Sequence, residues 1–477
     1  MIASIKKFFG PKKVRPTYPC RSTPWHQILP NILPRPKTPL SSSIILIISF
    51  AALIVLGGIL LMLPAASKTG HFTSPNDAFF MSTSAVCVTG LGVVDVFDHF
   101  SLFGQIVMLV LIQIGGFGFM TIATFFLLAF GRRIGLREKI FIGESLGVTR
   151  LGGLVKIVSL MTLFTVVVEA AGAGLYYIHF SSVFPAAEAV WRSIFHSVSA
   201  FNNCGFDLSG GFQSLIGYQH NPLFLLTTAG LIIVGGISFL VVVDILKKRG
   251  KWNGLTLDTK LVLSMTGVLL LAGTVVFLIT ESGNPNTLGP LSFPAKVLNA
   301  FFQSVTARTS GFASINIGSM MNFSLFFLMG LMFIGGASGS TAGGIKVNTF
   351  GLLTATIWSS IRGKEQPDAF GRQFVPTQVI KAIALVLISL GFIFVIVFIL
   401  SITEKTDFIK IMFETFSAFG TVGLTTGITP TLSVLGRILI IITMFVGRLG
   451  PITLTLALIQ QRPQANYRYP QESVRIG

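Results

Sequence analysis

Four short glycine loops recur along this chain, and each follows a brief, moderately apolar stretch. The glycines at positions 90, 205, 311 and 423 are 115, 106 and 112 residues apart. Repetition at this spacing predicts one structural unit that occurs four times. Four units can surround a single axis, and glycine loops facing that axis would present backbone carbonyls to it, which is how a protein replaces the water shell of a cation.

The predicted cation-binding residues are the glycine of each loop and the two residues before it. They are Val88, Thr89 and Gly90 in the first loop, Asn203, Cys204 and Gly205 in the second, Thr309, Ser310 and Gly311 in the third, and Thr421, Val422 and Gly423 in the fourth. Glycine adopts a positive φ without steric cost, which lets neighbouring carbonyls turn toward the axis. The sequence therefore predicts a selectivity filter with four contributing loops.

The composition places these loops in a membrane protein. Hydrophobic residues make up 52% of the 477-residue chain and charged residues only 11%, whereas soluble domains contain about 25% charged residues. The run Ser43–Leu63 holds 21 residues without a charge. As a helix it would be about 31 Å long, enough to cross the hydrocarbon core. Further long apolar runs predict a polytopic helical membrane protein.

Each repeat is predicted to contain a long helix, a short re-entrant helix, the glycine loop and a second long helix. The short helices are predicted at Asn76–Val86, Ala186–Phe201, Pro294–Thr306 and Asp407–Phe419, and the second long helices at Phe103–Phe130, Leu223–Leu246, Phe323–Phe350 and Val434–Ile459. The repeats span residues 42–131, 152–247, 259–351 and 376–461, between an N-terminal basic arm (1–41) and a C-terminal tail (462–477). The predicted fold class is an all-α polytopic membrane protein with four helix–pore-helix–helix repeats around a central ion pore.

The net charge of +18 follows from the predicted topology. Of the 35 Lys and Arg residues, 27 lie in five segments that fall on one side if each repeat crosses the membrane twice. The positive-inside rule makes that side cytoplasmic, with both termini there, in the cell membrane. Membrane lipid and a cytosolic partner are also expected to bind this positively charged side. Nucleic acid is not an expected partner because no soluble basic domain remains.

On the opposite side, Asp95, Asp98 and Asp207 lie near the loops, where they would concentrate cations or simply form a solvated loop surface.

The second long helix of the third repeat contains a run that no other repeat has. The run at 335–344, with the lysine that follows, supplies the predicted gate residues Gly335, Gly336, Ser338, Gly339, Ser340, Thr341, Gly343, Gly344 and Lys346. Each glycine costs up to about 1 kcal/mol relative to alanine in a helix interior, so the run predicts a break in the helix. A broken segment beneath a filter would act as a gate. The alternative is a helix-packing surface of small residues.

Two arginines lie close to these features. Arg448 sits within the last apolar helix, and an arginine inside a membrane normally faces an interior cavity or partner. Placed across from the glycine run, it would bind carbonyls there and repel a cation. Arg308 lies within the third loop and is predicted to brace the filter from behind.

The four loops, the Gly-Ser-Thr-Ala-Gly-Gly-Ile-Lys run at 339–346 and Arg448 resemble the Ktr/Trk/HKT superfamily of potassium transporters over about residues 43–460. With eight predicted spans and no extra helical pair before the first repeat, the chain is most similar to the KtrB membrane subunit. The resemblance implies a channel-like potassium uptake protein, with sodium stimulation as in other members. It also implies a homodimer with one pore per protomer on a cytosolic ring of KtrA-type nucleotide-binding subunits.

By the same resemblance, Gly90, Gly205, Gly311 and Gly423 are the filter glycines, residues 335–344 the intramembrane loop, and Arg448 the gate arginine. A serine in the first loop would indicate sodium permeability, so the glycine there favours potassium. No cofactor is expected in this chain. Potassium is expected at the filter alone. Sodium is an additional expected ion whose site the sequence leaves open, and ATP or ADP is expected on the partner subunit.

Two other classes of protein were weighed against a pore. An enzyme is not predicted, because no cluster of His, Asp, Glu, Ser or Cys has catalytic or metal-ligand spacing. Glu169, inside a long apolar helix, favours a sodium- or proton-coupled symporter with alternating access. Symporters usually have inverted repeats with broken helices in both halves. Here the repeats are parallel and only one helix is predicted to be broken, which favours the pore.

Overall fold

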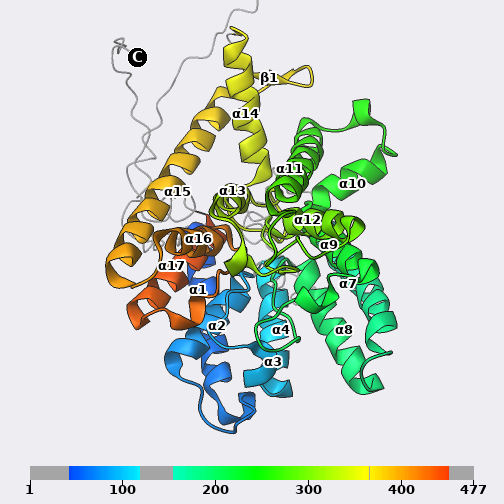
Figure 1. Cartoon of the computed structure of the whole chain (residues 1–477). Coiled ribbons are helices and arrows are strands. Elements are labelled where there is room, and N and C mark those ends of the chain that lie inside the picture. The colour runs from blue at the N-terminus through cyan, green and yellow to red at the C-terminus, as the bar shows by residue number, and fades with distance from the viewer. Residues whose placement is uncertain (1–41, 119–153, 365, 451–477) are drawn as a thin grey trace, which may run out of the picture. The chain divides into compact units, whose positions relative to one another are not determined.

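The computed structural model describes residues 42–118, 154–364 and 366–450. All of them belong to one of two compact units, 42–477, the other being 1–41. In the described ranges the regular secondary structure is helical apart from one two-stranded hairpin and two isolated β-bridges (Figure 1). The predicted N-terminal arm, the C-terminal tail and the ends of two predicted helices, 119–130 and 451–459, lie outside them.

The described elements follow the predicted order in each repeat. The first repeat contains α1 (Ser42–Met62), α2 (Pro75–Val86), α3 (Val96–His99) and α4 (Leu102–Phe117). The second contains α7 (Leu154–Phe180), α8 (Ala186–Phe201), α9 (Pro222–Gly236) and α10 (Phe239–Lys247). The third contains α11 (Leu257–Glu281), α12 (Phe293–Thr306), α13 (Asn322–Phe333) and α14 (Val347–Ile361). The fourth contains α15 (Pro376–Thr403), α16 (Phe408–Gly420) and α17 (Val434–Leu449).

Shorter elements connect these helices. Single 3-10 turns occur at Pro64–Ala66, Ile216–Tyr218, Trp252–Gly254, Ile317–Ser319 and Thr429–Thr431. Strands β1 (Asp368–Ala369) and β2 (Arg372–Gln373) form an antiparallel hairpin between α14 and α15, with Asp368 opposite Gln373. The hairpin lies at the far end of α14 from the centre of the molecule (Figure 1).

Local sequence signals set where several helices begin. The Ser74 hydroxyl accepts a hydrogen bond from the Asp77 amide at the start of α2, and Pro75 occupies the first turn. Ser101 caps α4 and Ser433 caps α17 in the same way. Such caps satisfy amides that have no partner within the helix. The helix starts are therefore readable from the sequence.

Three described helices are long and apolar enough to cross a membrane: Val158–Phe180 within α7, α11 and α15. The pair α9 and α10 meets the same test together, although the two helices are bent by 89°. The helices α2, α8, α12 and α16 contain 12, 16, 14 and 13 residues. About 20 residues are needed to span the hydrocarbon core, so these four helices are too short to cross it.

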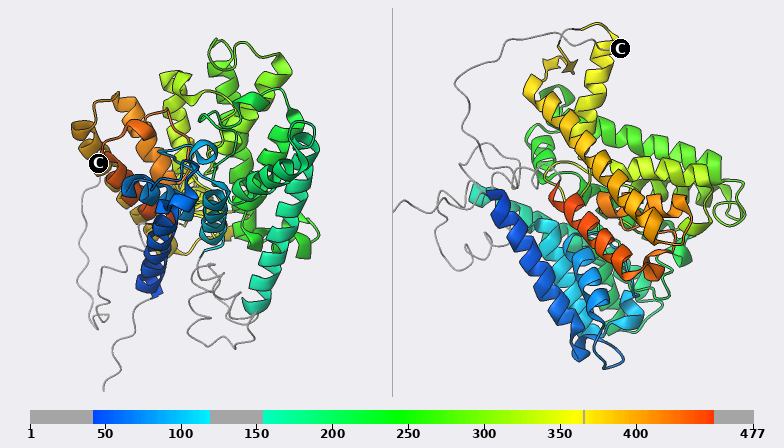
Figure 2. Two further views of the ribbon diagram at one scale, coloured as in Figure 1. Left: turned by 90° about the horizontal axis from the view of Figure 1, so that it is seen from below. Right: turned by 90° about the vertical axis from the view of Figure 1, so that its left-hand side faces the viewer.

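The repeats succeed one another around a common centre, as the progression of colours in Figure 1 shows. Helix α17 packs against α2, so the fourth repeat adjoins the first, and Figure 2 (right) shows the orange-red helices beside the blue ones. An ion pair of 2.5 Å between Arg437 of α17 and Asp77 of α2 joins the same two repeats. Buried apolar clusters also cross repeat boundaries, as where Leu61 and Ile440 share one cluster. The ring of repeats is therefore closed.

In three repeats, a glycine of the long helix lies against a serine of the short helix. Beta-carbons added at Gly57, Gly172 and Gly273 would lie 2.5, 2.6 and 2.2 Å from the hydroxyls of Ser82, Ser197 and Ser304. Each hydroxyl donates to a carbonyl three residues before the glycine, at distances of 2.6 to 2.9 Å. The missing glycine side chain lets the two helices touch, and the serine hydrogen bond fixes the position of the short helix along the long one.

This contact predicts a difference between two glycines of α11. Replacing Gly273 with alanine is expected to destabilise the protein by about 1–3 kcal/mol because it overpacks the contact with Ser304. Gly267 on the same helix has no atom within 4 Å of an added Cβ, so the Gly267→Ala control is expected to be neutral or stabilising. Thermal unfolding of purified protein in one detergent measures both. Equal melting temperatures for the two variants would contradict the contact.

The expectation that only one helix is broken is wrong. The predicted helix Leu223–Leu246 is two helices, α9 and α10, bent by 89°, because Gly235 and Gly236 weaken the first and Ser238 caps the second. In the third repeat, α13 ends at Phe333 and α14 begins at Val347. Helices α4 and α17 also end at glycines of positive φ, Gly118 and Gly450. In all four repeats, the helix that follows the glycine loop thus ends early: α4 at Phe117, α9 at Gly236, α13 at Phe333 and α17 at Leu449.

Candidate functional site

The four glycine loops form a closed ring. A Cβ atom added at Gly90 would lie 1.9 Å from the carbonyl oxygen of Cys204, in the second loop. A Cβ atom added at Gly205 would lie 2.4 Å from Ser310 O, and one added at Gly311 would lie 2.4 Å from Val422 O. A Cβ atom added at Gly423 would lie 2.1 Å from Thr89 O. Each glycine therefore faces the carbonyl of the residue before the glycine of the next loop, and the fourth loop returns to the first. Only glycine allows so close an approach.

The four loops also share one backbone conformation. The φ angles of the filter glycines are 86°, 83°, 80° and 93° in chain order. Two residues earlier, Val88, Asn203, Thr309 and Thr421 have φ of 55°, 59°, 71° and 48°, while the residues in between are not in the positive region. Positive φ is strained for β-branched residues. A backbone that alternates in this way turns successive carbonyls toward one side, as a ring of cation ligands requires.

Each loop is anchored to the end of its own short helix. The amides of Thr89, Cys204 and Val422 donate to the carbonyl five residues earlier at 2.8 to 2.9 Å, and Ser310 donates to Thr306 O at 3.1 Å. Hydroxyls add further bonds, from Ser199 to Phe206 O and from Thr306 to Phe312 O, both 2.6 Å. The C-terminal end of each short helix, where the helix dipole is negative, therefore lies directly at its loop.

The segment between α13 and α14 lies against the glycine loops. A Cβ added at Gly343 would lie 2.0 Å from Thr421 Oγ1, and one added at Gly335 would lie 3.1 Å from Thr309 Cγ2. The ends of the segment meet, since the Gly335 amide donates to Ile345 O at 2.8 Å. The predicted gate residues are thus in direct contact with two of the four loops.

The same segment is tied to the bend between α9 and α10. The Ala337 amide donates to Gly236 O at 2.9 Å, and the Thr341 hydroxyl donates to Gly235 O at 3.1 Å. Thr341 Oγ1 also lies 3.4 Å from Phe201 O, the last residue of α8. The break in α9 frees these carbonyls, and the segment uses them as acceptors. The two breaks therefore stabilise each other.

The remaining predicted gate residues shape the segment. The Ser340 hydroxyl donates to Ala337 O at 2.7 Å, and the Ser338 amide donates to Asn348 Oδ1 at 2.9 Å. Gly339 and Gly344 have φ of 74° and 62°. An added Cβ at Gly336 would lie 2.7 Å from Gly236 O. Glycine is thus required at three of these positions by conformation or by contact.

Three basic side chains hold the segment. Arg448 donates to Thr341 O and, at 2.5 Å, to Gly115 O at the end of α4. Arg308 donates to Gly335 O at 3.3 Å, so its side chain reaches the segment. Lys346 donates to Ala342 O. Three basic groups therefore lie directly at the segment.

A buried polar cluster lies behind the second loop. The sequence singles out one of its members, Glu169 in an apolar helix, but does not predict the contacts within the cluster. The Asn202 amide nitrogen donates to Gln113 Oε1 at 2.9 Å and to Glu169 Oε1 at 3.2 Å. Gln113 lies on α4, Glu169 on α7, and Asn202 ends α8. Because the three residues are up to 89 positions apart, no local pattern predicts their contact.

The carboxylates near the loops are engaged with backbone amides. Asp98 accepts from Gly211 N at 2.8 Å and Asp95 accepts from Phe212 N at 2.9 Å, which ties the first repeat to the second. Desolvation raises the pKa of Asp207 to about 6, against hydrogen bonds from Ser209 that lower it. The bonds to Gly211 N and Phe212 N make Asp98 and Asp95 structural links between the first and second repeats.

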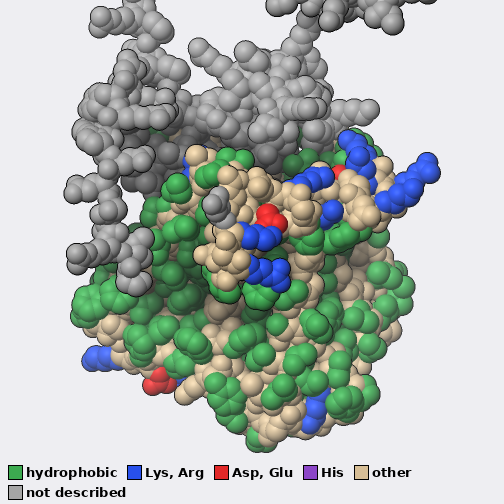
Figure 3. Space-filling view, turned by 90° about the horizontal axis from the view of Figure 1, so that it is seen from above, with side chains coloured by type: hydrophobic (Ala, Val, Ile, Leu, Met, Phe, Trp, Pro, Cys, Tyr) green, Lys and Arg blue, Asp and Glu red, His purple; other side chains and the backbone are tan. Residues whose placement is uncertain are grey.

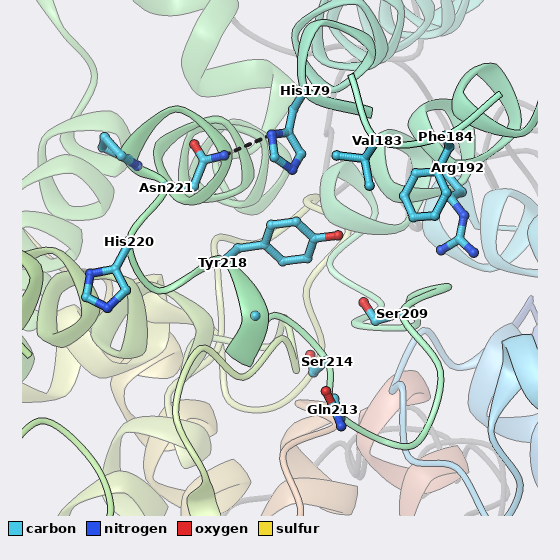
Figure 4. A pocket seen from close by; sticks show the side chains of 12 residues that line it. His179, Val183, Phe184, Arg192, Ser209, Gln213, Ser214, Tyr218, His220 and Asn221 are labelled. Atoms are coloured by element: carbon cyan, nitrogen blue, oxygen red, sulfur yellow. Dashed lines mark hydrogen bonds between the residues drawn. The ribbon is translucent and has the colours of Figure 1, made fainter. Parts of the chain in front are cut away.

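A separate cleft of about 700 Å³ lies beside α7 and α8 (Figure 4). Its walls include His179, Arg192 and Tyr218, and Asn221 is hydrogen-bonded to His179 at 3.0 Å. The Arg192 guanidinium pairs with Glu188 at 2.8 Å and donates to Leu208 O. The one guanidinium in its lining is thus already satisfied, and the cleft adds nothing to the ring of loops.

Comparison with known proteins agrees with this architecture. A family model described as a cation transport protein, TrkH, matches residues 38–469. The potassium/sodium uptake protein NtpJ of Enterococcus hirae is 42% identical over 434 residues, which is 90% of this chain and 95% of NtpJ. The Ktr system potassium uptake protein B of Bacillus subtilis is 41% identical over 433 residues, 91% of this chain and 96% of that protein.

The fold also matches a solved structure. The crystal structure of the potassium transporter TrkH from Vibrio parahaemolyticus superposes with a TM-score of 0.70. The match covers 89% of this chain and 86% of that one, at 19% sequence identity. At this identity the likeness concerns the fold alone.

Proposed function

The chain belongs to the TrkH family of cation transport proteins, and we propose that it takes up potassium through the ring of four glycine loops. It is a polytopic helical membrane protein and not an enzyme. The observation that carries the proposal is the closed sequence of contacts from Gly90 through Cys204, Ser310, Val422 and Thr89. A ring of four backbone carbonyls is a set of ligands suited to a dehydrated cation.

In this proposal the twelve loop residues form the selectivity filter. Carbonyl oxygens from the positions before each glycine replace the hydration shell of potassium. The four short helices direct the negative ends of their dipoles toward the ion. Similarity to proteins named for potassium uptake and for potassium/sodium uptake supports potassium as the main ion, with sodium as a second ion or a stimulator.

The segment 335–344 is the proposed gate. It contacts the filter residues Thr309 and Thr421 and is held by Arg448 and Arg308. With Lys346, these arginines place positive charge next to the segment, which opposes a cation there. Opening then requires that the segment leave its contacts with Arg448 and with the end of α9.

The partner proteins are also part of the proposal. Many exposed basic residues lie on the elements around α10, α14 and the hairpin: Lys247, Lys248, Arg249, Lys251, Arg362, Lys364 and Arg372. Figure 3 shows Lys and Arg side chains grouped on this face. The positive-inside rule makes it cytoplasmic. A cytosolic KtrA-type ring that binds ATP or ADP would dock there, under a homodimer of this chain in the cell membrane.

A sodium- or proton-coupled symporter is the second candidate. The bend between α9 and α10 and the carboxylate of Glu169 favour it, and the argument from a single broken helix no longer opposes it. The tight contacts among all four loops favour the pore, since alternating access moves one bundle against another around a site between repeats.

Potassium uptake in cells tests the proposed function. Expressed with a ring partner in a bacterium that lacks potassium uptake, the chain is expected to restore growth at low potassium. Cells that carry the empty vector, grown at the same potassium concentration, are the negative control. Growth no better than with the empty vector, while the wild-type protein is present in the membrane, would count against potassium uptake.

A further inference from the structure

The second filter loop is attached to the protein differently from the other three. The residue three positions before each filter glycine is Cys87, Asn202, Arg308 or Gly420 in chain order. Arg308 binds the segment at Gly335 O, and Gly420 has no side chain. Among the four, Asn202 alone binds a carboxylate in the described structure. Of these four positions, the one in the second loop is therefore the one that a carboxylate holds in the described structure.

Asn202 is held on several sides. Its amide nitrogen donates to Gln113 Oε1, Glu169 Oε1 and Val198 O at 2.9, 3.2 and 2.9 Å. On the other side, a Cβ added at Gly116 would lie 1.9 Å from Asn202 Oδ1. The amide group has no room to move without displacing α4.

The position of Asn202 bears directly on the ring. The next residue, Asn203, has φ of 59°, and the one after it, Cys204, supplies the carbonyl that faces Gly90. A shift at Asn202 is therefore passed over two residues to the junction between the first and second loops. This junction has the closest of the four contacts, at 1.9 Å.

The carboxylate strengthens this support. Glu169 accepts from Asn202 and, at 3.4 Å, from Gln113 Nε2. It takes part in none of the ion pairs among the described residues. Among the described residues, these two hydrogen bonds from side-chain amides hold its carboxyl group. Away from water, the loss of such a bond also leaves a polar group unsatisfied.

We propose that Glu169 and Gln113 are positioning residues for the second filter loop, and that they set the discrimination between potassium and sodium through the amide of Asn202. The inference rests on the proposed function, because it requires the loops to be the filter. The two residues do not touch the ion. They determine where the Cys204 carbonyl lies.

The test exchanges the hydrogen-bond donor and acceptor. Asn202→Asp places two carboxylates together and is expected to lower the ratio of potassium to sodium flux about tenfold; Glu169→Gln is expected to lower it about threefold. The double variant Glu169→Gln with Asn202→Asp restores one donor–acceptor pair between positions 169 and 202, with reversed direction, while the carboxylate introduced at 202 still faces Val198 O and Gln113 Oε1. Its ratio is therefore expected to lie above that of Asn202→Asp and below the wild-type value. Purified variants in liposomes, assayed with labelled potassium and sodium, give the ratio.

A control on the same helix separates positioning from stability. Among the described residues, the Thr162 hydroxyl bonds only within α7, to Val158 O at 3.0 Å, so Thr162→Val is expected to keep the wild-type ratio. If Asn202→Asp does not fold, Glu169→Gln and Gln113→Leu supply the test, each with a lowered ratio expected. An unchanged ratio in Glu169→Gln, or a double variant no better than Asn202→Asp, overturns the inference. Absence of potassium flux in the wild-type protein would instead overturn the proposed function.

Discussion

Replacing Gly90 with serine is expected to abolish selective potassium transport. The added Cβ would lie 1.9 Å from the Cys204 carbonyl oxygen, and the residue would have to keep a φ of 86°. Both demands push the first and second loops apart and move a carbonyl out of the ring. Because about 1.4 kcal/mol of differential site energy is a factor of ten, the ratio of potassium to sodium flux is expected to fall at least about tenfold.

Gly70 provides a matched control for this substitution. It also has positive φ, 70°, but no atom lies within 4 Å of an added Cβ. Gly70→Ser therefore carries the same kind of backbone strain without crowding a neighbouring loop. Its flux ratio is expected to equal that of the wild type. A wild-type ratio in Gly90→Ser, in protein that purifies normally, would remove the filter assignment.

Replacing Arg448 with alanine is expected to raise potassium flux about tenfold in the absence of a ring partner. A shift of about 1.4 kcal/mol in the free energy of gate opening is sufficient for a factor of ten. The variant loses the bonds from Arg448 to Thr341 O and Gly115 O, together with a positive charge beside the path. The filter loops themselves are unchanged. The ratio of potassium to sodium flux is therefore expected to stay at the wild-type value while total flux rises.

Two further variants sharpen this prediction. Arg448→Gln keeps one donor and removes the charge, so an intermediate flux separates anchoring from repulsion. Arg437→Ala removes another arginine of α17, one that pairs with Asp77 at 2.5 Å and not with the segment. It is expected to leave gating unchanged. Unchanged or reduced flux in correctly folded Arg448→Ala would contradict the gate.

The sequence predicted the ring because its determinants are local. Each loop carries its own glycine after its own short helix, so the four copies were visible as a repeat. The conformation could also be anticipated at Gly90, Gly205, Gly311 and Gly423, since glycine is the residue that tolerates positive φ. The positive φ of Val88, Thr309 and Thr421 could not, because β-branched residues avoid this region unless the surrounding structure imposes it.

The bend between α9 and α10 escaped sequence analysis for a different reason. Gly235 and Gly236 are tolerated in many apolar helices, and the run Leu223–Leu246 is long enough to span. The bend depends on the segment 335–344, whose Ala337 and Thr341 bind the carbonyls that it frees. A feature stabilised by residues about 100 positions away has no local signal. The same holds for the contact between Gln113 and Asn202.

The central claim is that four loops form one cation filter, and flux of labelled potassium, rubidium and sodium into liposomes tests it most directly. The wild-type protein is expected to admit potassium and rubidium well ahead of sodium, and Gly90→Ser is expected to lose that order while Gly70→Ser keeps it. Equal flux of the three ions through the wild-type protein, or the wild-type order in Gly90→Ser, would contradict the claim.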